Sequence, residues 1–185
     1  QEFKRMMCLK GGRNMNEQFY ERLSHPFRRT KRREKMFRLG SRLLTILVYL
    51  AYPIALLVFY LTRRQEFFMA VLVPLVSFCL LSVFRAVYDA PRPYEELRID
   101  PITKKDTKGK SFPSRHVFSA FLIAGVIWSL SKVFGIFYFM IGACIAASRV
   151  IGGVHYPKDV LAGGIAGILF WFIGQRLFLT IFLQS

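Results

Sequence analysis

Five long apolar segments alternate with short polar segments along most of this chain. They cover residues 41–61, 67–88, 114–130, 135–151 and 159–182. Each segment has close to the roughly 20 residues that an α-helix needs to cross a bilayer core about 30 Å thick. The few charged residues in these segments lie mostly at their ends. The pattern therefore predicts an all-α integral membrane bundle of about five transmembrane helices, in a single domain covering residues 41–185.

The segment before the first apolar run is polar and strongly basic, with aromatic residues scattered through it. Residues 15–40 are expected to lie on the membrane surface, with basic side chains toward anionic head groups and aromatic side chains below them. Pro26 should divide this region into two short amphipathic helices. The alternative interpretation is a solvated basic tail. Met15 is interpreted as the natural start, and residues 1–14 as an expression-derived or disordered segment.

The composition agrees with a membrane protein, since 54% of the 185 residues are hydrophobic and 16% are aromatic. Such a chain is too apolar for an ordinary soluble domain, and its length leaves no room for a second globular unit. The three cysteines, at positions 8, 79 and 144, are widely separated, so we expect small buried hydrophobic side chains and no disulfide. Gly163 and Gly167 form a small-residue stripe, which predicts close packing of the last helix against a neighbour.

Polar and ionisable residues gather in three short stretches at the ends of the apolar segments. The three are Arg85-x6-Arg92-Pro93, Pro113-Ser114-Arg115-His116 and Ser148-Arg149-x5-His155-x3-Asp159. A bilayer makes charge expensive, so ionisable residues at the ends of spanning helices indicate either chemistry or anchoring. Counting the crossings puts all three stretches on one side of the membrane. They are therefore predicted to form one site.

The arginines of these stretches suit the binding of a phosphate group. Guanidinium groups bind phosphate oxygens bidentately and always keep their charge, which assigns Arg85, Arg92 and Arg149 to phosphate binding. Fixed positive groups can also replace the divalent metal that many phosphoryl-transfer enzymes need. We therefore expect neither a metal ion nor another cofactor.

Two histidines and one carboxylate complete the predicted chemistry. Asp159 is spaced to orient His155, which leaves the other ring nitrogen free to attack phosphorus and form a phosphohistidine. His116 would protonate the departing alkoxide and later activate water. Each residue alone has a simpler explanation: an interfacial histidine, an arginine that reaches the head groups, or a helix N-cap for Asp159. Their occurrence on one face favours a shared catalytic site.

The three stretches resemble the signature of the type 2 phosphatidic acid phosphatase superfamily, which is written Lys-x6-Arg-Pro, Pro-Ser-Gly-His and Ser-Arg-x5-His-x3-Asp. The resemblance implies an integral-membrane, metal-independent phosphatase with an all-helical core. By motif position, it also implies that Arg92, Ser114 and Arg149 bind phosphate. The roles that it implies for the two histidines and the aspartate are those given above.

Two positions depart from the family signature. Arg85 stands where the family has lysine, which keeps the charge but replaces a compact ammonium with a wider fork. Arg115 stands where the family has glycine, whose backbone N–H can approach phosphate closely. Arg115 is expected either to keep that amide contact with its side chain turned away, or to bind a second phosphate or a substrate carboxylate.

A site at helix ends is reached most easily by a phosphate whose tail stays in the membrane, so the expected substrate is a lipid phosphate. Lipids of the phosphatidic acid or phosphatidylglycerol phosphate type are expected ahead of the polyprenyl diphosphates of lipid-carrier recycling. The vanadate-dependent haloperoxidases share this signature but are typically soluble, which the spanning helices argue against. A non-enzymatic protein that binds anionic lipid is the remaining alternative, and no nucleic-acid partner is expected.

Physical reasoning and the resemblance disagree on which side of the membrane the site faces. The predicted topology puts 23 of the 27 lysines and arginines on the side of the three stretches. When residues 1–14 and the five cations in or beside these stretches are left out, 14 lysines and arginines remain on the side of the stretches and four on the opposite side. Positive charge in the flanking segments favours the cytoplasmic side. Many relatives are taken to act at the outer or lumenal face. We expect a site that faces the cytoplasm of a bacterial cell.

Overall fold

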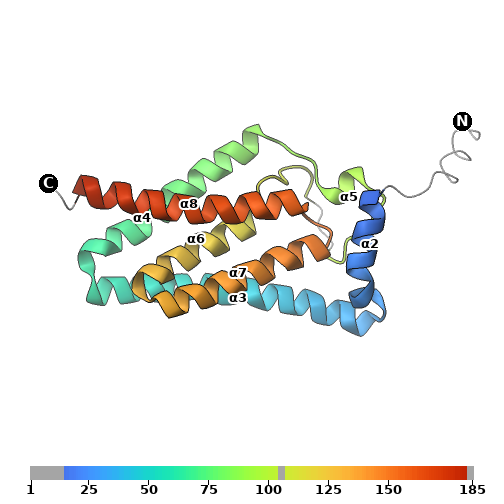
Figure 1. Ribbon diagram of the computed structural model, residues 1–185, viewed down its shortest axis with the longest axis horizontal. Helices are drawn as coiled ribbons and strands as arrows, with labels where there is room; N and C mark the ends of the chain where they lie inside the picture. Colours follow the sequence, from blue (N-terminus) through green and yellow to red (C-terminus); the bar gives the residue numbers. More distant parts are fainter. Residues whose placement is uncertain (1–14, 104–106, 183–185) are drawn as a thin grey trace, which may run out of the picture.

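The computed structural model describes residues 15–103 and 107–182, and the expectation for residues 1–14 lies outside them. Within these residues every regular element is a helix (Figure 1). The helices are α2 (Met15–Arg28), α3 (Lys31–Thr62), α4 (Arg64–Val87), α5 (Pro93–Glu96), α6 (Arg115–Leu130), α7 (Lys132–Ile151) and α8 (Pro157–Phe182). The predicted all-α class is confirmed.

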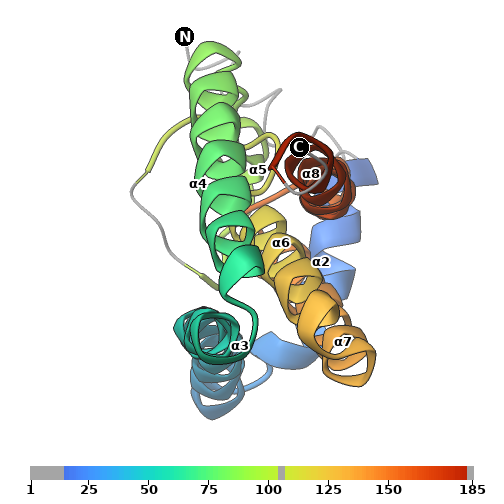
Figure 2. The ribbon, with the colours of Figure 1, turned by 90° about the vertical axis from the view of Figure 1, so that its left-hand side faces the viewer.

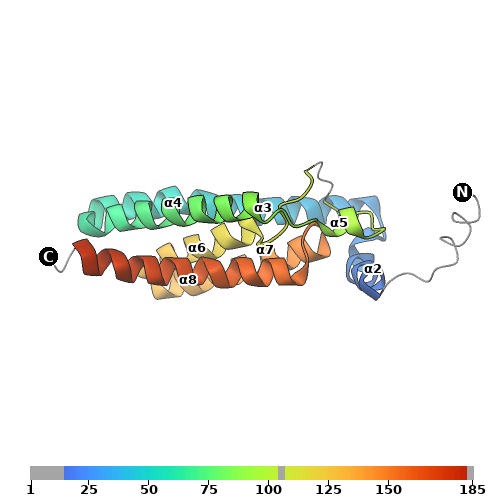
Figure 3. The ribbon, with the colours of Figure 1, turned by 90° about the horizontal axis from the view of Figure 1, so that it is seen from above.

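Five of these helices run lengthwise and form the predicted membrane bundle (Figure 3). Helices α3, α4, α7 and α8 are long and apolar enough to cross a bilayer. Helix α6 is also apolar but has 16 residues, a length of about 24 Å at 1.5 Å per residue. It lies in the middle of the bundle, in contact with the four longer helices (Figure 2). The crossing predicted at residues 114–130 is therefore a short central helix, and the other four enclose it.

The N-terminal region differs from the prediction in the position of its helix break. Helix α2 continues past Pro26, which lies in its last turn, where a proline removes one hydrogen bond close to the natural end. The break comes at Thr30, which has an extended backbone and whose hydroxyl accepts a hydrogen bond from the N–H of Arg33 at 3.3 Å. Helix α3 then runs from Lys31 into the span without interruption. Residues 31–40 therefore extend the first span and do not form a separate helix.

Helix α2 lies crosswise at one end of the bundle (Figure 1). The corner between α2 and α3 is fixed by Phe27 and Phe37, whose ring centroids are 4.8 Å apart. On its inner side, α2 places Tyr20 in the hydrophobic core. This helix therefore closes the end of the bundle at which α7 ends and α8 begins.

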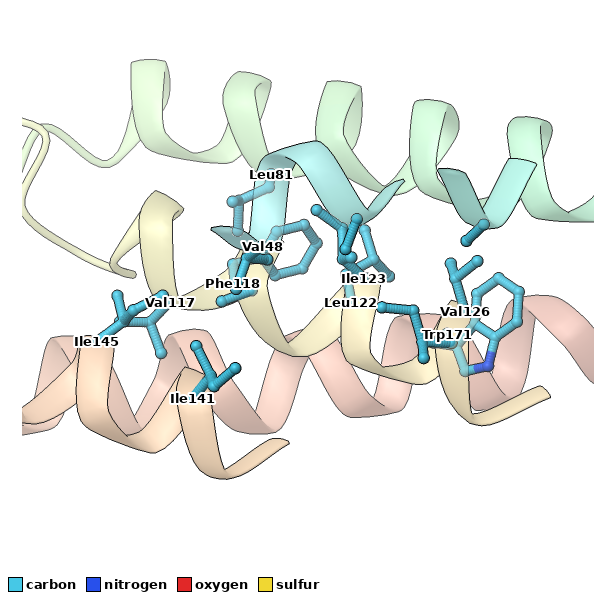
Figure 4. Close-up of a cluster of buried hydrophobic side chains, with 14 of the residues drawn as sticks. Val48, Leu81, Val117, Phe118, Leu122, Ile123, Val126, Ile141, Ile145 and Trp171 are labelled. Atoms are coloured by element: carbon cyan, nitrogen blue, oxygen red, sulfur yellow. The ribbon is translucent and has the colours of Figure 1, made fainter. Parts of the chain in front are cut away.

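The hydrophobic core centres on α6. Figure 4 shows Phe118, Leu122 and Val126 of α6 among side chains of the neighbouring helices, such as Val48 of α3 and Ile145 of α7. All five of these side chains are at most 3% exposed. The central helix therefore aligns the longer helices that carry the three polar stretches.

The predicted stripe of small residues on α8 packs against α6. A Cβ added to Gly163 would lie 2.7 Å from the carbonyl oxygen of Ser114, and a Cβ on Gly167 would lie 2.6 Å from that of Phe118. Since such distances are shorter than real side chains allow, the two backbones can approach only because these residues are glycines. The predicted close packing is confirmed, with α6 as the neighbour.

The outer face of the bundle is apolar, as contact with lipid requires. Leu50, Leu57 and Leu169 are exposed along this face. Cys79 and Cys144 have free thiols but are also exposed, although we expected them to be buried. The expectation was wrong because an apolar run contains both the residues that face protein and the residues that face lipid.

Candidate active site

The three polar stretches meet toward the end of the bundle at which α2 lies. Arg85 is in the last turn of α4, and Arg149 is in the last turn of α7. Ser114 is the N-cap residue of α6, and Asp159 is in the first turn of α8. The N–H of Ser114 donates to the carbonyl oxygen of Asp159 at 2.9 Å, which joins the second stretch to the third. The ends of four helices that carry the three stretches therefore lie on one side of the bundle, as predicted.

His155 and Asp159 form a buried pair at the turn between α7 and α8. His155 is 2% exposed, and Asp159 is completely buried. The Nδ1 atom of His155 lies 3.6 Å from Oδ2 of Asp159, which is longer than a hydrogen bond. Ser111 lies beside both side chains: its hydroxyl donates to Oδ2 of Asp159 at 2.5 Å and is 3.3 Å from Nδ1 of His155. The predicted pair is therefore a group of three.

The environment of His155 keeps its imidazole neutral. Burial lowers the pKa of His155 from 6.5 to about 4, although the contact with Asp159 acts in the opposite direction. The positive charges of Arg92 and Arg85 also lower this pKa. At neutral pH, one ring nitrogen of His155 therefore keeps the lone pair that a nucleophile needs.

Arg92, Ser114 and Arg149 each have a buried polar atom without a hydrogen-bond partner in the protein. These atoms are Nη1 of Arg92, Oγ of Ser114 and Nε of Arg149. Other atoms anchor both arginines: Nε of Arg92 donates to the carbonyl oxygen of Gly109 at 2.9 Å, and Nη2 of Arg149 donates to the hydroxyl of Thr45 at 3.2 Å. Because buried polar groups are normally paired, these anchored donors suit an anionic ligand.

The guanidinium group of Arg85 donates hydrogen bonds to backbone carbonyl oxygens of the protein itself. Its Nη1 donates to the carbonyl oxygens of Ser111, at 3.3 Å, and Pro113, and its Nη2 donates to that of Lys110. The side chain, which we assigned to phosphate binding, is therefore in contact with the loop that precedes α6. This loop places Ser111 beside His155 and Asp159.

Arg115 and His116, in the first turn of α6, line a groove between α3, α4 and α6. The groove has a volume of about 750 Å³ and apolar or aromatic walls that include Tyr52, Leu75 and Phe78. The Cζ atom of Arg115 is 5.8 Å from the centroid of the Phe78 ring, so its side chain is directed toward α4. The groove therefore connects the apolar space between α3 and α4 with the first turn of α6, where His116 lies.

A residue far from the three stretches also contacts the site. Tyr20 of α2 is 4% exposed, and its hydroxyl donates to the carbonyl oxygen of His155 at 2.9 Å. Burial raises the pKa of Tyr20, so the phenol stays protonated and can donate. Sequence reasoning missed both Tyr20 and Ser111. One is a tyrosine in a basic segment and the other a serine in a polar loop, and neither has a spacing that signals a site.

Two solved structures share this fold. LpxE of Aquifex aeolicus matches with a TM-score of 0.69 and 22% sequence identity, over 88% of this chain and 96% of its own. A transmembrane PAP2 type phosphatidylglycerolphosphate phosphatase from Bacillus subtilis matches with a TM-score of 0.69 and 21% identity, over 90% of this chain and 85% of its own. At this level of identity the likeness is one of fold.

Sequence comparisons extend the likeness to the polar stretches. The bacitracin transport permease protein BcrC of Bacillus licheniformis is 28% identical over 128 residues, which are 65% of this chain and 63% of that protein. The match thus spans less than two thirds of that relative. The sequence profile of the PAP2 superfamily matches residues 67–182, more than half of the chain, and this range includes all three stretches. This chain therefore belongs to the PAP2 superfamily.

Proposed function

We propose that this integral membrane protein is a lipid phosphate phosphatase, which hydrolyses a phosphomonoester of the phosphatidic acid or phosphatidylglycerol phosphate type through a phosphohistidine. One observation carries the proposal: buried donors without a protein partner lie at the same end of the bundle as a neutral histidine. These donors belong to Arg92, Ser114 and Arg149. His155 has its Nδ1 side turned to Ser111 and Asp159, which leaves Nε2 for attack.

In the proposed reaction, Nε2 of His155 attacks phosphorus, the Nε2–P bond forms, and the P–O bond to the lipid breaks. His116 gives a proton to the departing alkoxide and then takes one from the water that cleaves the Nε2–P bond. During transfer, negative charge lies on the three outer phosphoryl oxygens, where the guanidinium groups of Arg92 and Arg149 would stabilise it. The second step releases inorganic phosphate and restores the neutral imidazole.

The groove beside His116 supports a lipid as the substrate. Its walls come from two membrane-spanning helices and are largely apolar, so they suit a hydrocarbon tail. Its volume of about 750 Å³ is sufficient for part of such a tail. A lipid could therefore keep its tail between α3 and α4 while its phosphate reaches His155.

A polyprenyl diphosphate is the second candidate substrate, and the position of Arg115 favours it. Arg115 lines the groove next to His116, and no carboxylate pairs with it among the residues that the structure describes. A cation beside an apolar groove is stabilised by an anion, such as a second phosphate next to the one being cleaved. Phosphatidic acid has no such group.

Kinetics of Arg115→Gly would test whether Arg115 binds a second phosphate. The experiment compares kcat/KM on prenyl diphosphate and prenyl monophosphate, with Lys132→Gln, at the opposite end of the bundle, as the control. A greater loss on the diphosphate would support binding of a second phosphate by Arg115. Equal losses on both lipids would exclude it.

The proposed function is tested by phosphate release from the purified protein in detergent. The substrates are phosphatidic acid, phosphatidylglycerol phosphate and a prenyl diphosphate, each with and without a chelator. His155→Ala should abolish release and prevent the trapping of a phosphorylated protein from labelled lipid. His25→Ala removes an exposed histidine of α2 and is the matched control. Release by His155→Ala at the wild-type rate would refute the phosphohistidine, and no release by the wild-type protein would favour a lipid-binding role.

We also propose that the site faces the cytoplasm of a bacterial cell. The end opposite the site has Arg63 and Arg64 at the α3–α4 turn and Lys132 at the α6–α7 turn, whereas the basic α2 and the start of α3 lie on the site side. Positive charge in short flanking segments favours the cytoplasm. The three relatives named above are bacterial, which supports a bacterial membrane.

Cysteine labelling in intact cells tests this orientation. Single cysteines are introduced at exposed Lys108, in the loop on the site side, or at Lys132, in a background with Cys8, Cys79 and Cys144 replaced by alanine. A membrane-impermeant reagent should label Lys132→Cys and leave Lys108→Cys unlabelled until the cells are broken. The reverse result would place the site on the outer face.

A further inference from the structure

We infer that Ser111 is a positioning residue that connects His155 to Asp159 and fixes the proton on Nδ1 of the imidazole. The inference deepens the proposed function and rests on His155 as its nucleophile. Ser111 is completely buried and lies in the loop between α5 and α6, outside the three polar stretches. Its hydroxyl is nevertheless closer to both members of the pair than they are to each other.

The hydrogen-bond geometry around Asp159 determines what the Ser111 hydroxyl can do. Its oxygen lies 2.5 Å from Oδ2 of Asp159, a short contact typical of a hydroxyl that donates to a carboxylate. Oδ2 also accepts the N–H of Tyr156 at 3.0 Å, so this oxygen acts as an acceptor. A serine hydroxyl has one hydrogen, and here it is used on Asp159. Toward His155 the hydroxyl can therefore only accept.

This assignment fixes the tautomer of His155. The ring nitrogen in contact with the Ser111 hydroxyl is Nδ1, at 3.3 Å, so Nδ1 carries the proton that Ser111 accepts. The direct distance of 3.6 Å to Asp159 is too long for Nδ1 to donate there instead. With the proton on Nδ1, the lone pair of the neutral ring is on Nε2.

The resulting chain of hydrogen bonds, from Nδ1 through the Ser111 hydroxyl to Oδ2, explains how Asp159 could assist the reaction. When the Nε2–P bond forms and the P–O bond of the lipid breaks, the imidazole ring becomes positively charged. The carboxylate stabilises this charge through the hydroxyl, and no proton has to leave Nδ1. The leaving alkoxide takes its proton from His116.

The backbone of Ser111 is held on both sides, which makes the hydroxyl a fixed group. Its N–H donates to the carbonyl oxygen of Ala90 at 2.8 Å, and its carbonyl oxygen accepts from Nη1 of Arg85 at 3.3 Å. Arg85 therefore acts on His155 indirectly, by holding the residue that orients it.

The decisive measurement is the ¹⁵N NMR signal of the His155 ring in wild-type protein and in Ser111→Ala. The wild-type ring should be protonated at Nδ1, and Ser111→Ala should show a mixture of tautomers. Ser111→Thr, which keeps a hydroxyl, should restore the Nδ1 form. Ser77→Ala is the control, because it removes another buried hydroxyl, one that donates to Val73 at 2.6 Å within α4. An unchanged tautomer in Ser111→Ala, or a wild-type ring protonated at Nε2, would overturn the inference.

Kinetics provide a second, independent test. Ser111→Ala should lower kcat roughly tenfold or more while changing KM less than about threefold, because orientation of the nucleophile matters in the transition state. Adding Ser111→Ala to Asp159→Asn should have little further effect, since both act through one chain. Additive losses would contradict this connection. A wild-type protein without phosphatase activity would refute the proposed function, whereas the NMR result would still decide the role of Ser111.

Discussion

The hydroxyl of Tyr20 donates a hydrogen bond to the carbonyl oxygen of His155 at 2.9 Å, although the two residues are 135 positions apart in the sequence. The contact is buried, and the Tyr20 ring also meets the ring of Tyr156 edge to face, at a centroid distance of 6.4 Å. Helix α2 lies outside the range that matches the family, which begins at residue 67. A segment beyond the family core therefore supports the turn that carries the proposed nucleophile.

Tyr20→Phe removes this hydrogen bond and keeps the ring. Leaving a buried carbonyl unpaired costs about 1–3 kcal/mol, so we expect a lower unfolding temperature and a severalfold lower kcat. Tyr60→Phe, which loses a hydrogen bond with Arg64 at the opposite end of the bundle, is the control. Wild-type kcat and stability in Tyr20→Phe would show that α2 does not support the His155 turn.

Two glycine substitutions should change stability in opposite directions. Gly167→Ala places a Cβ 2.6 Å from the carbonyl oxygen of Phe118, so α6 and α8 must separate, at a cost of about 1–3 kcal/mol. Gly40→Ala in α3 meets no atom within 4 Å and should stabilise the helix by up to about 1 kcal/mol. Thermal unfolding in detergent measures both. Equal effects would mean that the contact between α6 and α8 is looser than described.

The neutral His155 predicts that stability depends on pH. Burial lowers its pKa to about 4 in the folded protein, against 6.5 ordinarily. Between these values the unfolded chain binds one more proton, so the free energy of unfolding falls as the pH drops from 6.5 to about 4. The loss is of the order of 3 kcal/mol, and this group has no effect above pH 6.5. His155→Gln should show a shallower slope in that window, and an identical slope would contradict the low pKa.

Arg85→Lys should impair the protein, although lysine is the residue of the family signature. One ammonium cannot replace a guanidinium group that donates to the carbonyl oxygens of Lys110, Ser111 and Pro113. We expect faster hydrogen exchange at the amide of Ser111 and a lower kcat. Arg64→Lys, at the other end of the bundle, should change neither. An unaltered rate of hydrogen exchange at the Ser111 amide in Arg85→Lys would show that the loop does not depend on the guanidinium group of Arg85.

Most of the fold could be predicted because membrane spans leave a strong signal in sequence. A run of about 20 apolar residues has few alternatives to a spanning helix, and polar turns mark its ends. The errors arose where local residues do not decide the outcome. Helix α2 continues past Pro26 to Arg28, and Thr30 is the N-cap at which the next helix begins. The exposure of Cys79 and Cys144 depends on which side of each helix faces lipid.

The candidate site was only partly predictable for a related reason. Fixed spacings identified His155, Asp159 and the arginines, and counting the crossings brought them to one end. Ser111 and Tyr20 contact the site because a loop and a crosswise helix fold back onto it. The same residues would look no different in the sequence if they were in solvent. The role of Arg85 likewise depends on where three carbonyl groups point.

The short central helix has a consequence for biosynthesis. Helix α6 emerges from the ribosome before α7 and α8, yet it contacts both and has only 16 residues. A helix of this length is shorter than the usual span, so we expect it to integrate stably only together with its neighbours, the last of which is α8. Asp159, in the first turn of α8, arrives at the same moment. We therefore expect the site and the membrane bundle to be completed together, and translation products that stop before α8 to be targets for proteolytic quality control.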